Sequence, residues 1–472
     1  MTSIALPAPT TGQLQMRLGL VFALAISVRN IIGSGIMRTP GLVADQVPVV
    51  WMVIALWALG GLHALLSANI VAELITKLPK AGGTYVPVRA AFGELMGLLC
   101  GWTDWLSNTA AIAALSVACA TFLGTIFPSL MPHTATVAAG FALTVIAINW
   151  PGVRQGQFAQ TSGSVLKVGL IVGVMAVAFL AEPVSVGEVA TRLGDATVSA
   201  AHAVGFFAVI SAYQMVYGAY LGWHAPIYFI EEDANAVKNI PRAIGISILG
   251  VTAIYVALNL SLLSALDMTA LRASDLPVAL VIENAFGRSG GILVAMLAII
   301  IVVVAINAVV MGTARILYGM ARDRLFLPVA MRVNKGGTPH IALAITAVVA
   351  VPVIFSGAFV FLFKLTAALA IFNFFLCEFS LFALRRQQPG LHRPHRAIGY
   401  PLLPALVCLL DLGLLIAFIA ADPMSGVYMA GLIAVCIPIG IILHRRREAI
   451  SLKVGAIFLF GPGAFNGEVP GE

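Results

Sequence analysis

NIIGSGIMRTPG, residues 30–41, lies within the first strongly apolar stretch of the chain, directly after Arg29. Gly33 and Gly35 flank a serine here, although each glycine inside a helix costs about 1 kcal/mol relative to alanine. An apolar segment that weakens its own helix beside an arginine is expected to break there. The composition of the whole chain shows in which surroundings that break would lie.

The composition is that of an integral membrane protein. Of the 472 residues, 60% are hydrophobic and only 10% are charged, whereas soluble chains carry about 25% charged residues. Residues 1–15 are polar and lack the basic start and small-residue cleavage site of a secretory signal. The first span is therefore expected to remain as the insertion signal.

Cysteine and histidine give no sign of a metal site or of catalysis. All five cysteines fall within apolar runs, and no CxxC pair or Cys/His cluster occurs. Disulfide and zinc frameworks need such spacings. The eight histidines form no HExxH motif, and no G-x-S-x-G motif is present. The sequence therefore predicts neither an enzyme nor a bound cofactor or metal.

The apolar stretches are long enough to cross a membrane many times. A helix needs about 20 apolar residues to span the hydrocarbon core. On this scale the chain contains about 12 candidate spans, which predict an all-α membrane fold. They are residues 17–43, 48–76, 91–127, 133–150, 158–181, 201–230, 242–265, 290–321, 339–356, 360–384, 401–420 and 426–444.

Lysine and arginine residues gather in the loops that follow the even-numbered spans. Lys77 and Lys80 follow the second span, Arg385 and Arg386 follow the tenth, and residues 445–447 follow the twelfth. Cytoplasmic loops carry an excess of basic residues, so both termini are expected in the cytoplasm. The net charge of +7 then needs no nucleic-acid partner.

A helix break at membrane depth has a chemical consequence. Irregular backbone is tolerated there only where it lines a cavity or is buried in protein. The break leaves free N–H groups at one half-helix end and free C=O groups at the other, which suit an anion and a cation. An α-amino acid presents both charges. Discontinuous helices in corresponding halves of a chain mark the binding sites of secondary transporters.

A second weak point lies five spans after the first, in Gly218-Ala-Tyr-Leu-Gly-Trp223. Its glycines could instead be packing residues, because small residues four apart are common where membrane helices pack. Two such sites, five spans apart, favour a pair of helix breaks.

Five motifs, in order along the chain, resemble the amino acid–polyamine–organocation (APC) superfamily of permeases. IIGSGIM lies in the first span, and GG…AEL…PKAGGTY…FG runs through and beyond the second. AYLGW…EED…NIPRAI begins in the sixth span. ARILYGMARD ends the eighth span, and KGGTPHIA follows it. LRRQQPGLHRPHRAIGYPLLP follows the tenth. The resemblance covers nearly the whole chain.

The resemblance implies two inverted five-helix repeats, with broken helices in the first and sixth spans, plus two C-terminal helices. The chain would then divide into four parts. These are a cytoplasmic tail at 1–16, a ten-helix transport core at 17–384, the last two helices with their preceding basic loop at 385–444, and a cytoplasmic tail at 445–472.

By the same resemblance, backbone groups at the two breaks bind the substrate. N–H groups at the first break hold its carboxylate, and carbonyl groups of both breaks hold its ammonium. The N–H groups are those of Ser34, Gly35 and Ile36, and the carbonyls are those of Ile31, Gly218, Ala219 and Leu221. The remaining predicted substrate-binding residues are Gly33, Tyr220, Gly222 and Trp223. Relatives often carry an aromatic cap where Gly218 stands, so Tyr217 or a residue elsewhere must cover this site.

Lys167 lies in the fifth span, seven residues after Gln160. It could be a snorkelling residue at the membrane interface. It also resembles a lysine that, in some family members, occupies the position used by sodium in related transporters. Its ammonium would then bridge the Arg29 and Ile32 carbonyls to the eighth span. Because burial favours the uncharged amine, Lys167 could carry a coupling proton.

Arg29 leaves two interpretations open. It could form a structural pair inside the membrane, with Asp104 or with a carbonyl of the eighth span. It could also meet the substrate or shape the inward pathway, and His224, which follows Trp223, is a second candidate for that pathway.

The sequence thus predicts a secondary transporter that moves amino acids across the cytoplasmic (inner) membrane. It would be coupled to protons or work as an exchanger, independently of sodium. A polyamine or other organic-cation transporter is the alternative, although neither break carries an acidic side chain. A membrane amino acid sensor would need a larger cytoplasmic domain. Heteromeric relatives attach a heavy chain through a cysteine in the loop at 127–134, which has none here, so no covalent heavy chain is expected.

Overall fold

The structure, a computed structural model, describes residues 19–80, 82–151, 154–181, 204–233, 235–390, 392–436 and 438, without the side chains of 34, 154–166, 181 and 232. The predicted tails at 1–16 and 445–472, and the end of the predicted span 426–444, lie outside the described residues. Within them the regular structure is helical and no strand is formed.

The described part of the first half of the chain contains one broken helix and four long ones. α1 (Leu20–Ile31) and α2 (Ser34–Gln46) are the two halves of the first predicted span, and α3 (Val50–Lys77) is the second. The predicted span 91–127 forms α5 (Glu94–Ile126), which follows a short α4 (Tyr85–Phe92). The others are η1 (Pro128–His133), α6 (Thr134–Asn149) and α7 (Arg154–Ala181).

The second half opens with the other break. α10 (Phe206–Tyr220) ends there and η2 (Ala225–Glu232) follows, so the predicted span 201–230 is not one continuous helix. α13 (Pro277–Arg322) consists of two helical segments that meet at Gly287, whose φ of 73° is not helical, and the second segment starts close to the predicted 290. The remaining elements are α11 (Ala236–Ala265), α12 (Met268–Ala273), η3 (Pro328–Met331), α14 (His340–Phe355), α15 (Phe359–Gln387), α16 (Leu402–Ala421) and a helix over Pro423–Cys436.

The helices have the length and the surface that a membrane protein needs. Eight helical stretches of the described part are long and apolar enough to cross a bilayer. Their outward faces carry large apolar side chains, such as Leu249, Leu293 and Leu409, which are more than half exposed. In water such surfaces would associate, whereas lipid covers them. The predicted all-α membrane class is therefore confirmed.

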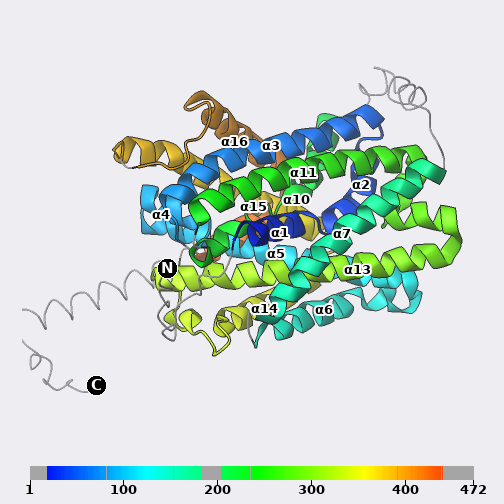
Figure 1. Cartoon of the computed structure of the whole chain (residues 1–472), viewed down its shortest axis with the longest axis horizontal. Helices are drawn as coiled ribbons and strands as arrows, with labels where there is room; N and C mark the ends of the chain where they lie inside the picture. Colours follow the sequence, from blue (N-terminus) through cyan, green and yellow to red (C-terminus); the bar gives the residue numbers. More distant parts are fainter. Residues whose placement is uncertain are drawn as a thin grey trace, which may run out of the picture.

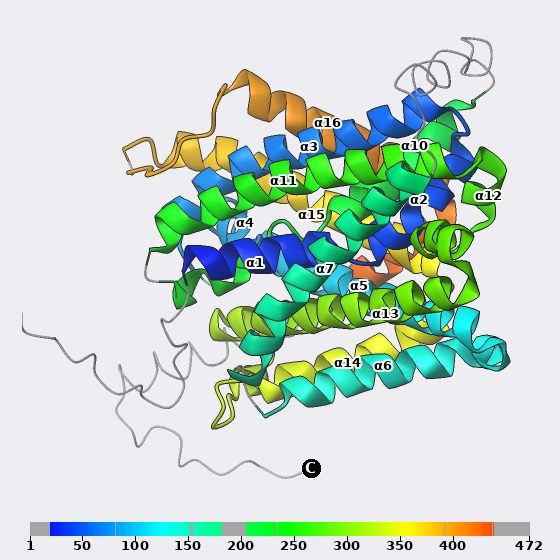
Figure 2. The ribbon, with the colours of Figure 1, turned by 45° about the vertical axis from the view of Figure 1, so that its right-hand side comes forward.

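The two broken helices lie in the centre of the bundle. In Figures 1 and 2, α1 and α5 lie between a layer with α3 and α11 and a layer with α6 and α14. α1 packs on α11 and α7, and α2 packs on α10. α5 contacts both α13 and α15. The breaks are therefore enclosed by other helices, as irregular backbone in a membrane must be.

Both ends of the bundle are held by ion pairs between helices. At the end where α3, α13 and α15 finish, Glu73 binds Arg385 at 2.5 Å, and Arg322 binds Glu231 of η2 at 2.8 Å. At the opposite end the pairs are Arg38–Asp275 and Arg272–Asp45.

Candidate functional site

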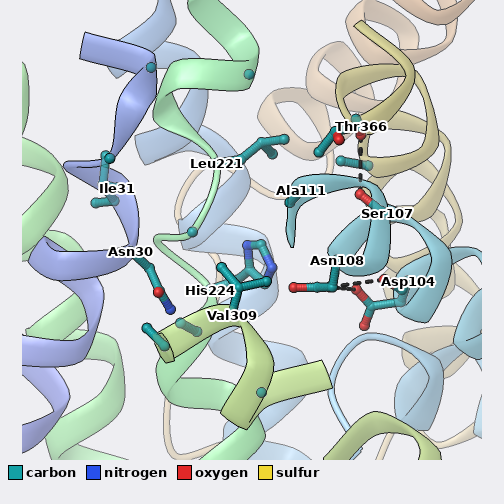
Figure 3. A pocket seen from close by; sticks show the side chains of 18 of the residues that line it. Asn30, Ile31, Asp104, Ser107, Asn108, Ala111, Leu221, His224, Val309 and Thr366 are labelled. Carbon is teal, nitrogen blue, oxygen red and sulfur yellow. Dashed lines mark hydrogen bonds between the residues drawn. The ribbon is translucent and has the colours of Figure 1, made fainter. Parts of the chain in front are cut away.

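A pocket lies where the two breaks meet (Figure 3). Figure 3 shows Ile31 on the first break and Leu221 on the unwound stretch of the second, with side chains of α5 across from them. Seven of the residues predicted to bind the substrate line this pocket: Ile31, Gly33, Gly35, Gly218, Ala219, Leu221 and Gly222.

Glycine allows the two breaks to touch. A Cβ atom on Gly35 would lie 2.9 Å from the Ala219 Cα, closer than real side chains approach. A Cβ on Gly222 would lie 2.7 Å from the backbone carbon of Asn30. Gly222 also has a φ of 106°, a conformation that favours glycine. The glycines that weaken each helix are therefore needed for contact between the halves.

The backbone at the breaks offers the groups that the sequence analysis named. α1 ends at Ile31, and Ile32 and Gly33 are extended before α2 begins. No side chain caps the first turn of α2, so its N–H groups are available to an anion. At the second break the Gly218 carbonyl already accepts a bond from the Leu221 N–H, at 3.2 Å.

Tyr255 of α11 joins the two breaks, and no sequence motif predicted this. Its hydroxyl lies 2.7 Å from the Ile31 carbonyl oxygen and 3.2 Å from that of Ala219. These are two of the carbonyls predicted to hold a substrate ammonium. A carbonyl oxygen has two lone pairs, so each can accept a second donor. The only sequence signal at Tyr255 is a polar atom inside an apolar span.

Lys167 of α7 binds the end of α1. Its Nζ donates to the Arg29 carbonyl at 2.9 Å and to the Ile32 carbonyl at 2.7 Å, and the side chain is fully buried. These are the two carbonyls that the sequence analysis named. Among the described residues, Lys167 makes no hydrogen bond to α13, the eighth predicted span. A role in proton coupling stays a prediction.

Arg29 is fully buried, and its three guanidinium nitrogens have no hydrogen-bond partner among the described residues. It does not line the pocket. Asp104, one predicted partner, instead accepts bonds from Tyr228 at 2.8 Å and from Asn108 at 3.1 Å. The predicted structural pair between Arg29 and Asp104 is thus not formed.

A polar wall faces the breaks across the pocket, and sequence reasoning did not identify it as one. Asp104, Ser107 and Asn108 come from α5, and Thr84 and Asn373 from flanking elements. Figure 3 shows the Asn108–Asp104 hydrogen bond and the one from Ser107 to the Thr366 carbonyl. These side chains are distant in sequence from both breaks, so no local motif connects them.

Two polar atoms of the pocket wall have no protein partner. Asn30 Oδ1 and His224 Nδ1 are buried without a hydrogen bond to the described residues. Both residues line the pocket, and Figure 3 shows them on its break side. Since buried polar atoms are normally paired, these two are available to a bound molecule. The prediction that His224 faces a pathway is compatible with this position.

Phe363 of α15 fills the space above Gly218. A Cβ on Gly218 would lie 2.6 Å from a ring carbon of Phe363, and one on Gly35 would lie 3.5 Å from the same ring. Tyr217 instead points away from the pocket, with its ring 5.5 Å from that of His63. The aromatic cover of the site is therefore Phe363 and not Tyr217.

Four of the residues predicted to bind the substrate are not among the described residues that line the pocket. Tyr220 donates to the Trp57 carbonyl at 2.8 Å, and Trp223 stacks on Phe374 at 5.0 Å between ring centres. Ile36 is fully buried. None of these three side chains lines the pocket in the described part of the chain. The side chain of Ser34 lies outside the described residues.

A family model for amino acid permeases matches residues 18–442. The chain belongs to the amino acid permease family. The family lies within the APC superfamily, so the predicted resemblance is confirmed. This permease is a transporter and not an enzyme.

The permease is similar to transporters from bacteria and animals. It is 26% identical to the serine/threonine exchanger SteT of Bacillus subtilis (strain 168), over 87% of this chain and 93% of that protein. It is 28% identical to the human b(0,+)-type amino acid transporter 1, over 89% of this chain and 86% of that protein. It is 31% identical to the human large neutral amino acids transporter small subunit 2, over 56% of this chain and 50% of that protein.

Proposed function

We propose that this permease moves α-amino acids across the cytoplasmic membrane by alternating access, independently of sodium. The observation that carries the proposal is the meeting of two helix breaks in one enclosed pocket. The first turn of α2 offers N–H groups, and the ends of α1 and α10 offer carbonyls. Opposite half-helix ends suit the two charges of a zwitterion.

In the proposed complex the backbone holds the part that all α-amino acids share. The carboxylate lies against the N–H groups of Ser34, Gly35 and Ile36. The ammonium lies against carbonyls of Ile31, Gly218, Ala219 and Leu221. The substrate side chain then faces the polar wall and Phe363. Gly33 and Gly222 support these groups from within the breaks, and Tyr220 and Trp223 support them from behind the pocket lining.

The proposed architecture is that of two inverted repeats in residues 17–384, followed by two helices in 385–444. Discontinuities in the first and sixth spans support it, since they are the corresponding positions of two five-span halves. We place the end with Glu73 and Arg385 in the cytoplasm, because the basic loops after the even-numbered spans lie there. Both tails are then cytoplasmic.

Lys167 is the proposed coupling residue, and its two bonds to the end of α1 support this. Its positive charge holds the inner half of the first span, and loss of a proton would release that half. The permease would accordingly use a proton gradient or work as an exchanger. No covalent heavy chain is proposed, because all five cysteines are buried.

Uptake into proteoliposomes tests the coupling. Replacing sodium by choline at fixed pH should leave uptake unchanged, whereas an imposed pH gradient should drive accumulation. Lys167→Ala should lose that accumulation and keep substrate binding, because Lys167 does not line the pocket. Uptake that stops without sodium, or an unchanged pH profile in Lys167→Ala, would refute this role for Lys167.

Asp104 favours a second candidate function. The sequence has no acidic side chain at either break, which disfavours a polyamine or other organic cation as the substrate. The fold, however, brings Asp104 into the pocket wall. A carboxylate buried there could pair with a substrate amine. Uptake of radiolabelled serine, leucine, arginine and putrescine separates the two. Amino acid uptake without putrescine uptake supports the main proposal, and the reverse supports the alternative.

A further inference from the structure

A second group of ionisable side chains lies inside the bundle, away from the substrate pocket. His63 of α3, Glu378 of α15 and Asp411 of α16 are each at most 3% exposed. None of them lines the pocket between the breaks. Ionisable residues within membrane spans are costly, and they commonly mark proton relays. The three residues form what we term the α3–α15–α16 cluster.

His63 connects this cluster to α10. Its Nε2 lies 2.6 Å from Asp411 Oδ1, and its Nδ1 lies 2.9 Å from the Tyr213 hydroxyl. A neutral imidazole donates from one nitrogen and accepts at the other. With Asp411 ionised, Nε2–H donates to the carboxylate and the Tyr213 hydroxyl donates to Nδ1. This assignment leaves neither His63 nor Tyr213 with a further proton to give.

The cluster has more acceptors than donors. Asp411 Oδ2 and both carboxyl oxygens of Glu378 are buried without a hydrogen-bond partner of normal geometry among the described residues. Yet the Glu378 carboxyl faces Asp411, with Ser67 and His63 also near it. Two adjacent buried carboxylates cannot both stay ionised. One proton on Glu378 would turn an orphan acceptor into a donor toward Asp411.

The other side chains around the pair are uncharged. Tyr213 and Tyr217 face it from α10, Cys377 from α15 and Cys408 from α16. None of these supplies a positive charge to balance two carboxylates. A proton bound by the pair is the smallest addition that satisfies its hydrogen bonds and reduces its charge.

A short path leads from the cluster to the substrate pocket. Tyr217, whose ring lies 5.5 Å from that of His63, directly precedes Gly218 at the second break. A small cavity is lined by Ser67 and Tyr217 and also by Leu221 and Phe374. Leu221 and Phe374 also line the substrate pocket. The cluster thus contacts the helix whose end forms the second break.

We propose that His63, Glu378 and Asp411 form a proton-binding site, separate from Lys167, that acts through α10 on the substrate pocket. The proton is shared between the Glu378 and Asp411 carboxyl groups. Its binding and release change how firmly His63 holds Tyr213, and hence the position of α10 at the break. The link to transport rests on the proposed amino acid transport, whereas proton binding itself does not.

Infrared difference spectroscopy on the purified permease tests the bound proton directly. The spectrum at neutral pH should contain the carbonyl band of a buried, protonated carboxyl group. Glu378→Gln should remove that band, while Glu283→Gln, which changes an exposed carboxylate of α13, should keep it. A band that survives in both Glu378→Gln and Asp411→Asn would overturn the proposal. So would a band that sodium abolishes at constant pH, because the pair would then bind a metal cation.

Transport by the same variants tests the link to α10. The measured quantity is the ratio of accumulation driven by a pH gradient to exchange without a gradient. This ratio should fall by about tenfold or more in Glu378→Gln. Tyr213→Phe, which removes only the bond to His63, should lower the same ratio. An unchanged ratio in both variants would overturn the link to transport. If wild-type permease exchanges no amino acid, the proposed function fails, while the infrared band still decides whether the proton site exists.

Discussion

Gly35 shows what the first break requires of a single residue. The sequence predicted a weak point from two glycines, which explains why the helix ends but not why it ends beside another helix. The structure adds the contact, because Gly35 lies against Ala219 of the second break. A local pattern cannot report a partner that lies far along the chain.

Gly35→Ala should therefore impair transport, although alanine favours helices. Its Cβ would lie 2.9 Å from the Ala219 Cα and 3.0 Å from the Ala219 Cβ. Overpacking of this kind costs about 1–3 kcal/mol, and here it would separate the two breaks. We expect substrate affinity to fall about tenfold, measured by scintillation proximity binding. Gly250→Ala, where a Cβ meets open space, is the control. Equal affinities in both variants would contradict the contact.

Arg29 is a second residue whose environment decides its role. A buried cation without a partner is unfavourable, and each unsatisfied group costs about 1–3 kcal/mol. Arg29→Met should therefore raise the melting temperature of the purified permease. Arg315→Met should lower it, because Arg315 is held by the Met311 carbonyl at 3.0 Å and by the Phe229 ring. A less stable Arg29→Met protein would show that Arg29 makes stabilising contacts in solution.

At the scale of elements, the sequence predicted helices more reliably than their joints. Apolar runs of membrane length gave the positions of the spans, since hydropathy depends on composition alone. The ends differed where glycine intervenes, as at Gly93, which separates α4 from α5, and the sequence did not predict the helical segment that precedes Gly287 in α13. The polar wall was not foreseen, because α5 reaches the pocket only through packing.

Tyr255 is the element-scale link between the breaks. Tyr255→Phe removes the hydroxyl that bonds to the Ile31 and Ala219 carbonyls. A hydrogen bond contributes about 1 kcal/mol, so substrate affinity should fall about fivefold with little change in folding. Binding of a radiolabelled amino acid measures this. Tyr428→Phe, at an exposed position, serves as the control, and a Tyr255→Phe affinity equal to that of the control would show that Tyr255 does not organise the site.

At the scale of the molecule, the distribution of basic residues predicts which end faces the cytoplasm. Thr269→Cys in α12 should react with a membrane-impermeant maleimide added outside intact cells. Lys335→Cys, between η3 and α14, should react only after the cells are opened. Both positions are exposed, and the five native cysteines are buried, which keeps the background low. Labelling of Lys335→Cys in intact cells would reverse the orientation.

In the proposed complex, two opposed helix breaks bind the two charges of one amino acid. Counterflow in proteoliposomes tests this binding, with one amino acid loaded inside and a series of analogues competing outside. The free amino acid should compete, while its N-acetyl derivative, its methyl ester and the matching amine should each compete at least about tenfold less. Equal competition by the amine that lacks a carboxylate would contradict the account, because the first turn of α2 would then bind nothing.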